Sequence, residues 1–237
     1  MAEGGLRIGT FAGAAIIVDW SVALLAGYLI LSALDNGGFA ALPSALVLLA
    51  ALLSAILLHE FGHAGVAAAL NLPSKRIVLS FMGGHVEFAH PPQRRWHDIA
   101  VSAAGPLANL ATAGALFLIP PFSAPDAAGG ALAIAYLQSL MMISLLLGVF
   151  NLLPGFPLDG GRILTAALSF AMNVARARLI TAVLGFLIAA ATGSWGYVNS
   201  YWWTLGVSLL LALAALAEFR FAQAQLRTAQ DAGRSNT

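Results

Sequence analysis

Residues 57–65 read Leu-Leu-His-Glu-Phe-Gly-His-Ala-Gly, inside an apolar run from Pro43 to Leu70 that has one carboxylate and no Lys, Arg or Asp. In a helix, His59 and His63 are four residues apart, so both imidazoles face one side, about 40° out of alignment. Glu60 follows His59 directly and can reach a water molecule held between the imidazoles. The stretch therefore predicts a metal site with two neutral His ligands, an open position for water and a carboxylate that accepts a proton.

The alternative is a pair of structural histidines that match the five-residue pattern by chance. An ionisable side chain at membrane depth costs about 2.5 kcal/mol or more, and such residues are retained mainly where they serve a function. The apolar surroundings of His59, Glu60 and His63 therefore favour the metal site over the accidental pattern.

The composition predicts an integral membrane protein. The chain has 237 residues, of which 60% are hydrophobic and only 9% charged, whereas soluble domains carry about a quarter charged residues. Long apolar runs recur, which predicts a polytopic helical protein. No cysteine is present, so zinc would need His and carboxylate ligands. The net charge of +1 argues against a nucleic-acid partner, and no cleaved signal peptide is expected.

The predicted fold class is an all-α polytopic membrane protein with about six transmembrane helices and a short membrane-associated β-hairpin region. The spans are expected at about residues 20–34, 43–70, 98–118, 131–153 and 178–191, with a sixth ending near 221. The aromatic residues that precede the sixth span predict a membrane interface; they are Trp195, Tyr197, Tyr201, Trp202 and Trp203. One transmembrane domain is expected over residues 1–222, followed by a polar cytoplasmic tail at 223–237 whose last dozen residues are expected to be loose.

Two segments have strand-like patterns. Residues 77–82 and 85–88 flank Gly83-Gly84, which predicts a hairpin with a glycine turn. Residues 7–11 and 15–18 either pair as a second hairpin or form the start of a long first helix, and the sequence leaves both open. A loop with one charged residue, Asp126, is expected at 120–130.

The basic residues predict the orientation. All eleven lie within or at the edges of residues 1–19, 71–97, 154–177 and 220–237. With six spans these segments share one side of the membrane. Because Lys and Arg are retained in cytoplasmic loops, both termini are expected in the cytoplasm.

A catalytic zinc ion has three protein ligands, so a third is needed. The fourth predicted span breaks at residues 151–161, Asn-Leu-Leu-Pro-Gly-Phe-Pro-Leu-Asp-Gly-Gly. Broken helices at membrane depth occur where backbone lines a cavity or is buried in protein. Asp159 would lie at a depth comparable to His59 and is the predicted third ligand; alternatively it caps a helix that starts at Gly160. Weaker candidates, with no assigned role, lie in or beside the hairpin loop: His85, Glu87, His90 and His97.

The His59–His63 motif together with residues 151–161 resembles the site-2 protease family of intramembrane zinc metalloproteases. The Gly83-Gly84 hairpin and residues 104–109, Ala-Gly-Pro-Leu-Ala-Asn, are also similar to family features, and the resemblance covers roughly residues 6–170. The resemblance implies that His59, His63 and Asp159 hold one zinc ion and that Glu60 is the general base. It also implies that Asn109 points into the site, where its amide would help stabilise the tetrahedral oxyanion.

The expected function is hydrolysis of a peptide bond within or near the transmembrane segment of a single-span membrane protein in a bacterial or archaeal cell membrane. The resemblance suggests regulated intramembrane proteolysis of tethered regulators such as anti-sigma factors, with substrate gating by the last two spans. Family members often carry a PDZ or paired CBS module, and neither occurs in these residues. The alternative is a metal-ion transporter or sensor with the same His/His/Asp ligands. Glu60 favours the protease, because a transporter needs no base beside two ligands.

Overall fold

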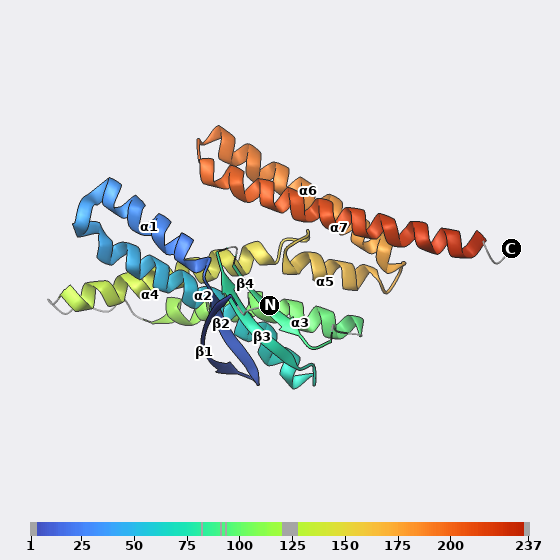
Figure 1. The fold of residues 1–237 in the computed structure, drawn as a ribbon, viewed down its shortest axis with the longest axis horizontal. Helices are drawn as coiled ribbons and strands as arrows, with labels where there is room; N and C mark the ends of the chain where they lie inside the picture. The colour runs from blue at the N-terminus through green and yellow to red at the C-terminus, as the bar shows by residue number, and fades with distance from the viewer. Residues whose placement is uncertain (1–3, 82, 91, 93, 120–127, 235–237) are drawn as a thin grey trace. The chain divides into compact units, whose positions relative to one another are not determined.

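The computed structural model describes residues 4–81, 83–90, 92, 94–119 and 128–234 (Figure 1). The chain divides into two compact units. Unit 1 comprises Met1–Pro91 and Ala104–Val149, and unit 2 comprises Pro92–Ala103 and Phe150–Thr237. A single domain over residues 1–222 stays a prediction.

Unit 1 contains a four-stranded sheet with the order β1-β2-β3-β4. Its strands are β1 (Gly5–Phe11), β2 (Ala14–Asp19), β3 (Ser74–Ser80) and β4 (Gly83–Phe88). β1 and β2 pair antiparallel, so the N-terminal segment forms a hairpin rather than the start of a helix. Ala12 and Gly13 between them both have positive φ, 48° and 82°, which a tight type I′ turn requires. β2 pairs with β3 in parallel, and this joins the two hairpins into one sheet.

The second hairpin is confirmed, but its turn is not at Gly83-Gly84. β3 and β4 pair antiparallel with Ser80 opposite Gly83, so both glycines belong to β4 and the turn precedes them. Gly83 has a φ of 118°, a conformation that favours glycine. At Gly84 glycine is required by space and not by backbone conformation, because a Cβ there would lie 2.5 Å from Oε1 of Glu60. Glycine at this position lets the carboxylate side chain approach the strand.

The helices of unit 1 are α1 (Val22–Gly37), the short 3-10 helix η1 (Gly38–Ala41), α2 (Leu42–Ala69), most of α3 (Arg95–Leu118) and nearly all of α4 (Ala128–Asn151). α2 packs on one face of the sheet. Phe61 stacks on Phe11 with ring centroids 4.1 Å apart, and Ala64 is buried with Ile16 and Ile77. Because Phe61 and Ala64 lie within or beside the His59–His63 motif, the sheet sets the rotation of the motif about the α2 axis.

Unit 2 contains the first turns of α3 and the helices α5 (Asp159–Leu168), α6 (Val174–Val198) and α7 (Trp202–Arg234). α6 and α7 lie side by side as a long hairpin (Figure 1). The predicted interfacial aromatic residues occur around the connection between them and are exposed. α7 continues to Arg234, so residues 226–234 are helical where the sequence predicts a loose end; the polar tail from residue 223 stays a prediction. The segment is rich in Ala, Gln, Leu and Arg, which have high helix propensity.

Within the part of the chain that the structure describes, five helical stretches are long and apolar enough to cross a membrane: Val22–Ala69, Arg95–Leu118, Gly130–Asn151, Val174–Val198 and Trp202–Thr228. The predicted number of six is not confirmed. The difference arises at the first stretch, which contains both α1 and α2. The stretch counts once because α1, η1 and α2 follow one another without a break. Asp126 and most of its expected loop lie outside the described residues.

Candidate metal centre

α2 presents its two histidines and its one carboxylate in buried positions. His59, Glu60 and His63 are 6%, 4% and 7% exposed. The two imidazole rings are edge-to-face, with centroids 4.7 Å apart and an interplanar angle of 82°. The four-residue spacing therefore places both rings on one side of α2, as the sequence predicts.

Gly105 on α3 provides the space in front of both rings. A Cβ at Gly105 would collide with Nε2 of His63 and would lie 2.8 Å from Nε2 of His59. Both Nε2 atoms therefore face the same point of the α3 backbone. A Cβ at Gly62 would in turn collide with the carbonyl group of Ala104, so α2 and α3 approach each other closely at the motif. The two glycines together bring the histidine rings against α3 without filling the space in front of them.

Asn109 lies one helical turn beyond Gly105 and contacts the other edge of His59. Its amide Nδ2 is 3.3 Å from Nδ1 of His59, and the side chain is fully buried. The ring of His59 thus has Nδ1 toward Asn109 and Nε2 toward Gly105. The sequence places Asn109 near the site through the resemblance, but it gives no signal of this contact with His59.

Glu60 lies against the sheet. The atoms closest to a Cβ built on Gly84 are Oε1, Cγ and Cδ of Glu60. β4 therefore runs directly beside the carboxylate that the sequence identifies as the general base.

Asp159 is held by the break between α4 and α5. A Cβ at Gly160 would collide with the carbonyl oxygens of Leu152 and Leu153, and one at Gly161 would lie 2.6 Å from the backbone of Gly155. The glycines therefore let the residues after α4 fold back onto the first turn of α5. Leu158 is the N-cap of α5. Asp159 is thus the first helical residue and not the cap that the alternative interpretation requires.

Two contacts within unit 2 hold α5 near the beginning of α3. Nη2 of Arg162 donates a hydrogen bond to Oδ1 of Asp98 at 3.0 Å. The guanidinium group of Arg95 lies 5.5 Å from the centroid of the Phe170 ring. α5 therefore has contacts of its own that fix the helix on which Asp159 lies.

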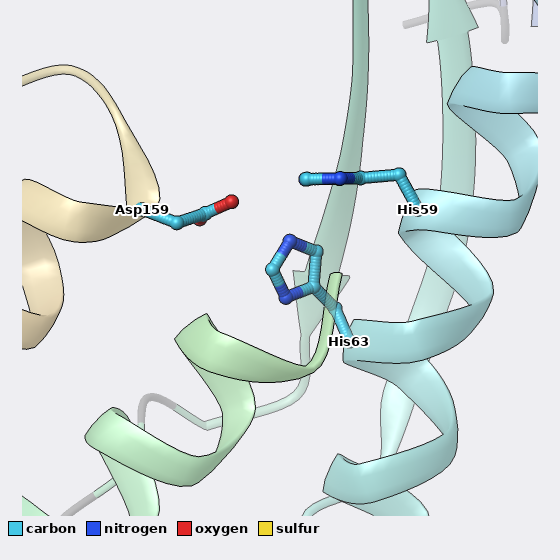
Figure 2. Close-up of side chains that lie close together, drawn as sticks. All are labelled: His59, His63 and Asp159. Carbon is cyan, nitrogen blue, oxygen red and sulfur yellow. The ribbon is translucent and has the colours of Figure 1, made fainter. Parts of the chain in front are cut away.

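Among the described residues, His59, His63 and Asp159 form a group that could hold a metal ion. One ligand atom from each lies within 4.8 Å of the others (Figure 2). Two imidazoles and one carboxylate are the protein ligands of a well-known class of catalytic zinc site, in which the fourth position is left for water. The donor set fits zinc, and the missing Cβ at Gly105 leaves room beside both Nε2 atoms.

The four weaker candidates for metal ligands lie outside the group formed by His59, His63 and Asp159. On β4, Glu87 accepts a hydrogen bond from Nε of Arg76 at 2.7 Å, and this hydrogen bond holds the pKa of Glu87 below its ordinary value. His85 is exposed and lies 3.8 Å from Glu87. His97 packs edge-on against Trp96, with ring centroids 4.1 Å apart. His90 is exposed.

Comparison with known proteins identifies a family. The family model described as Peptidase family M50 matches residues 47–127 and 123–192. A solved structure, described as the site-2 protease from Methanocaldococcus jannaschii, has a TM-score of 0.66 and 25% sequence identity, over 91% of this chain and 95% of that chain.

Two curated relatives have similar sequences. One, from Synechocystis, is 30% identical and covers 96% of this chain and 64% of its own length. The other, a zinc metalloprotease from Methanocaldococcus jannaschii, is 30% identical over 76% of this chain and 51% of its own length. The chain thus spans between about half and two thirds of the length of these relatives.

Proposed function

The chain belongs to peptidase family M50, and from this membership we propose that it is an integral-membrane zinc protease that hydrolyses a peptide bond within or beside the transmembrane segment of another membrane protein. The observation that carries the proposal is the grouping of one ligand atom each from His59, His63 and Asp159 within 4.8 Å. Regulated proteolysis of a single-span substrate, such as a tethered transcription regulator or anti-sigma factor, is the biological setting we propose.

In this proposal His59 and His63 would hold a zinc ion through Nε2, and Asp159 would hold it through a carboxylate oxygen. A bound zinc ion would lower the pKa of a water molecule toward 7 and polarise the scissile carbonyl group. The orientation of both Nε2 atoms toward Gly105 supports this ligand assignment.

Glu60 is the proposed general base. Its carboxylate takes a proton from the attacking water and then donates that proton to the leaving nitrogen. The position of Glu60 next to His59 in sequence, and its burial, support this role. Because the surroundings are buried, the carboxylate acts where bulk water does not compete for the proton.

The substrate must be extended before it can be cleaved, because a helix hides its backbone carbonyl groups in hydrogen bonds. We propose that the unwound segment binds along β4. Among the described residues β4 pairs with β3 on one side only, so its other edge can accept a strand about 4.8 Å away. The contact between Gly84 and Glu60 would place the backbone of such a strand close to the general base.

We propose that both termini are cytoplasmic, in a bacterial or archaeal cell membrane. The clustering of all eleven basic residues in four segments supports this orientation. Water would then reach the metal from the cytoplasmic side.

The test is cleavage of candidate single-span substrates by the purified full chain in lipid vesicles, with and without a zinc chelator. Wild type should cleave only when zinc is present, and Glu60→Gln should keep one zinc ion per chain while cleavage falls by several orders of magnitude. Retained cleavage in the variant would reject Glu60 as the base. Zinc movement across the vesicle without any cleavage would instead favour a metal transporter.

A further inference from the structure

The contact between Asn109 and His59 concerns the nitrogen that does not face the proposed metal position. A neutral imidazole carries its proton on one nitrogen and a lone pair on the other. If Nε2 of His59 is to bind zinc, Nδ1 must carry the proton, and the group opposite Nδ1 must accept a hydrogen bond. Asn109 is the residue opposite Nδ1, at 3.3 Å.

The two orientations of the Asn109 amide have opposite consequences. If Nδ2 faces the ring, it donates to Nδ1, the proton of His59 resides on Nε2, and Nε2 has no lone pair for a metal. If Oδ1 faces the ring, it accepts from Nδ1–H and leaves the Nε2 lone pair available. The two orientations differ by a half turn of the amide and have nearly the same shape.

Apart from His59, no hydrogen-bond partner of the Asn109 amide among the described residues favours the orientation with Nδ2 toward the ring. Asn109 is fully buried, and with Nδ2 toward His59 its Oδ1 has no hydrogen-bond partner. A half turn exchanges the unpaired atom without changing the number of hydrogen bonds. The orientation of the amide is therefore set by the protonation of His59: a proton on Nδ1 requires the acceptor Oδ1 to face the ring.

We propose that Asn109 is a positioning residue whose Oδ1 accepts a hydrogen bond from Nδ1–H of His59 and so fixes the tautomer that binds metal through Nε2. The proposal rests on the zinc site described above. It differs from a role in stabilising the oxyanion, because it predicts an effect on zinc binding when no substrate is present.

The test compares two substitutions at residue 109 in the full chain in detergent. Asn109→Leu has a similar shape but removes the acceptor, and zinc affinity measured by chelator competition should fall about 10- to 100-fold. Asn109→Asp keeps an acceptor and should bind zinc within a few-fold of wild type. The matched control is Ser102→Ala, which alters another fully buried polar residue of α3 and should leave zinc affinity unchanged.

A spectroscopic readout keeps the test decisive if the leucine variant does not fold. The chain has five histidines, so nitrogen NMR of labelled rings can assign His59 by comparison with His59→Gln. Zinc-loaded wild type and Asn109→Asp should both show a protonated Nδ1 on His59. A protonated Nε2 on His59, or zinc bound at Nδ1, would overturn the proposal.

The outcomes separate this inference from the proposed function. If wild type binds no zinc, the zinc site itself is wrong. If wild type binds zinc and His59→Gln loses it, but Asn109→Leu binds as tightly as wild type and only cleavage falls, the site stands and the role of Asn109 through His59 is rejected.

Discussion

Replacing Gly105 with alanine adds one methyl group where α3 faces the two histidine rings. In the interior of a helix this change normally stabilises by about 0.5–1 kcal/mol, because alanine loses less conformational freedom than glycine. At Gly105 the new Cβ would collide with Nε2 of His63 and lie 2.8 Å from Nε2 of His59. Both rings would have to turn away from the positions in which they are proposed to bind zinc.

The cost of the added methyl group can be estimated. Inserting a methyl group into a packed interior costs about 1–3 kcal/mol. The metal-free protein can relieve this strain by rotating the rings, whereas the zinc-bound protein cannot, so the strain falls mainly on the bound state. At about 1.4 kcal/mol per tenfold, zinc affinity should fall by roughly 5- to 150-fold.

Gly114 provides the matched control on the same helix. A Cβ at Gly114 would meet nothing within 4 Å, so Gly114→Ala should keep wild-type zinc affinity and unfold at the same or a slightly higher temperature. The assay is chelator competition on both purified variants, with thermal unfolding of the metal-free forms. If Gly105→Ala binds zinc as tightly as Gly114→Ala, the two Nε2 atoms do not bind a metal in front of Gly105.

Three further changes test other parts of the structure. Asp159→Ala should lower the zinc content of purified protein measured by atomic absorption, and an unchanged stoichiometry would reject Asp159 as a ligand. Gly84→Ala should displace the Glu60 side chain, so that cleavage falls while zinc content is kept; unaltered cleavage would contradict the contact. The hydrogen bond from Arg76 lowers the pKa of Glu87 in the folded protein. The ionised Glu87 therefore stabilises the fold at pH values above the pKa it has in the unfolded chain, and this stabilisation is lost as pH falls through its pKa in the folded protein. The difference in unfolding temperature between wild type and Glu87→Gln should therefore shrink on acidification, from a contribution of at most about 1 kcal/mol at this half-exposed pair.

Much of the candidate site could be predicted because its chemistry is local in sequence. His59, Glu60 and His63 lie within five residues in an apolar run, and the helical period alone puts the two imidazoles together. Asp159 is distant in sequence, but it is the carboxylate in the helix break at residues 151–161, and broken helices at membrane depth indicate a site. The structure groups its ligand atom with those of the two histidines.

The parts of the fold that were missed depend on contacts between distant segments. The hydrophobic pattern predicts the second hairpin and leaves the first open between a hairpin and the start of a helix. Nothing in residues 14–19 or 74–80 signals that β2 and β3 pair in parallel. The two glycines of β4 predict a turn from the sequence alone, because Gly-Gly is a common turn pair. Gly84 is instead required by a side chain of α2, and this cannot be known until β4 is placed beside Glu60.

The same reasoning applies to α3, where residues 102–105 are the small residues Ser-Ala-Ala-Gly. Small residues in membrane helices usually indicate close helix packing, and Gly62 against Ala104 fits that explanation. Gly105 does not, since the atoms in front of it are the ring nitrogens of His59 and His63. A glycine selected for helix packing should tolerate alanine if the helices separate slightly, whereas a glycine selected for a metal should not tolerate it at any helix spacing. The comparison of Gly105→Ala with Gly62→Ala therefore separates the two causes. Gly62→Ala should reduce the stability of the metal-free protein more than its zinc affinity, whereas Gly105→Ala should reduce zinc affinity more than the stability of the metal-free protein.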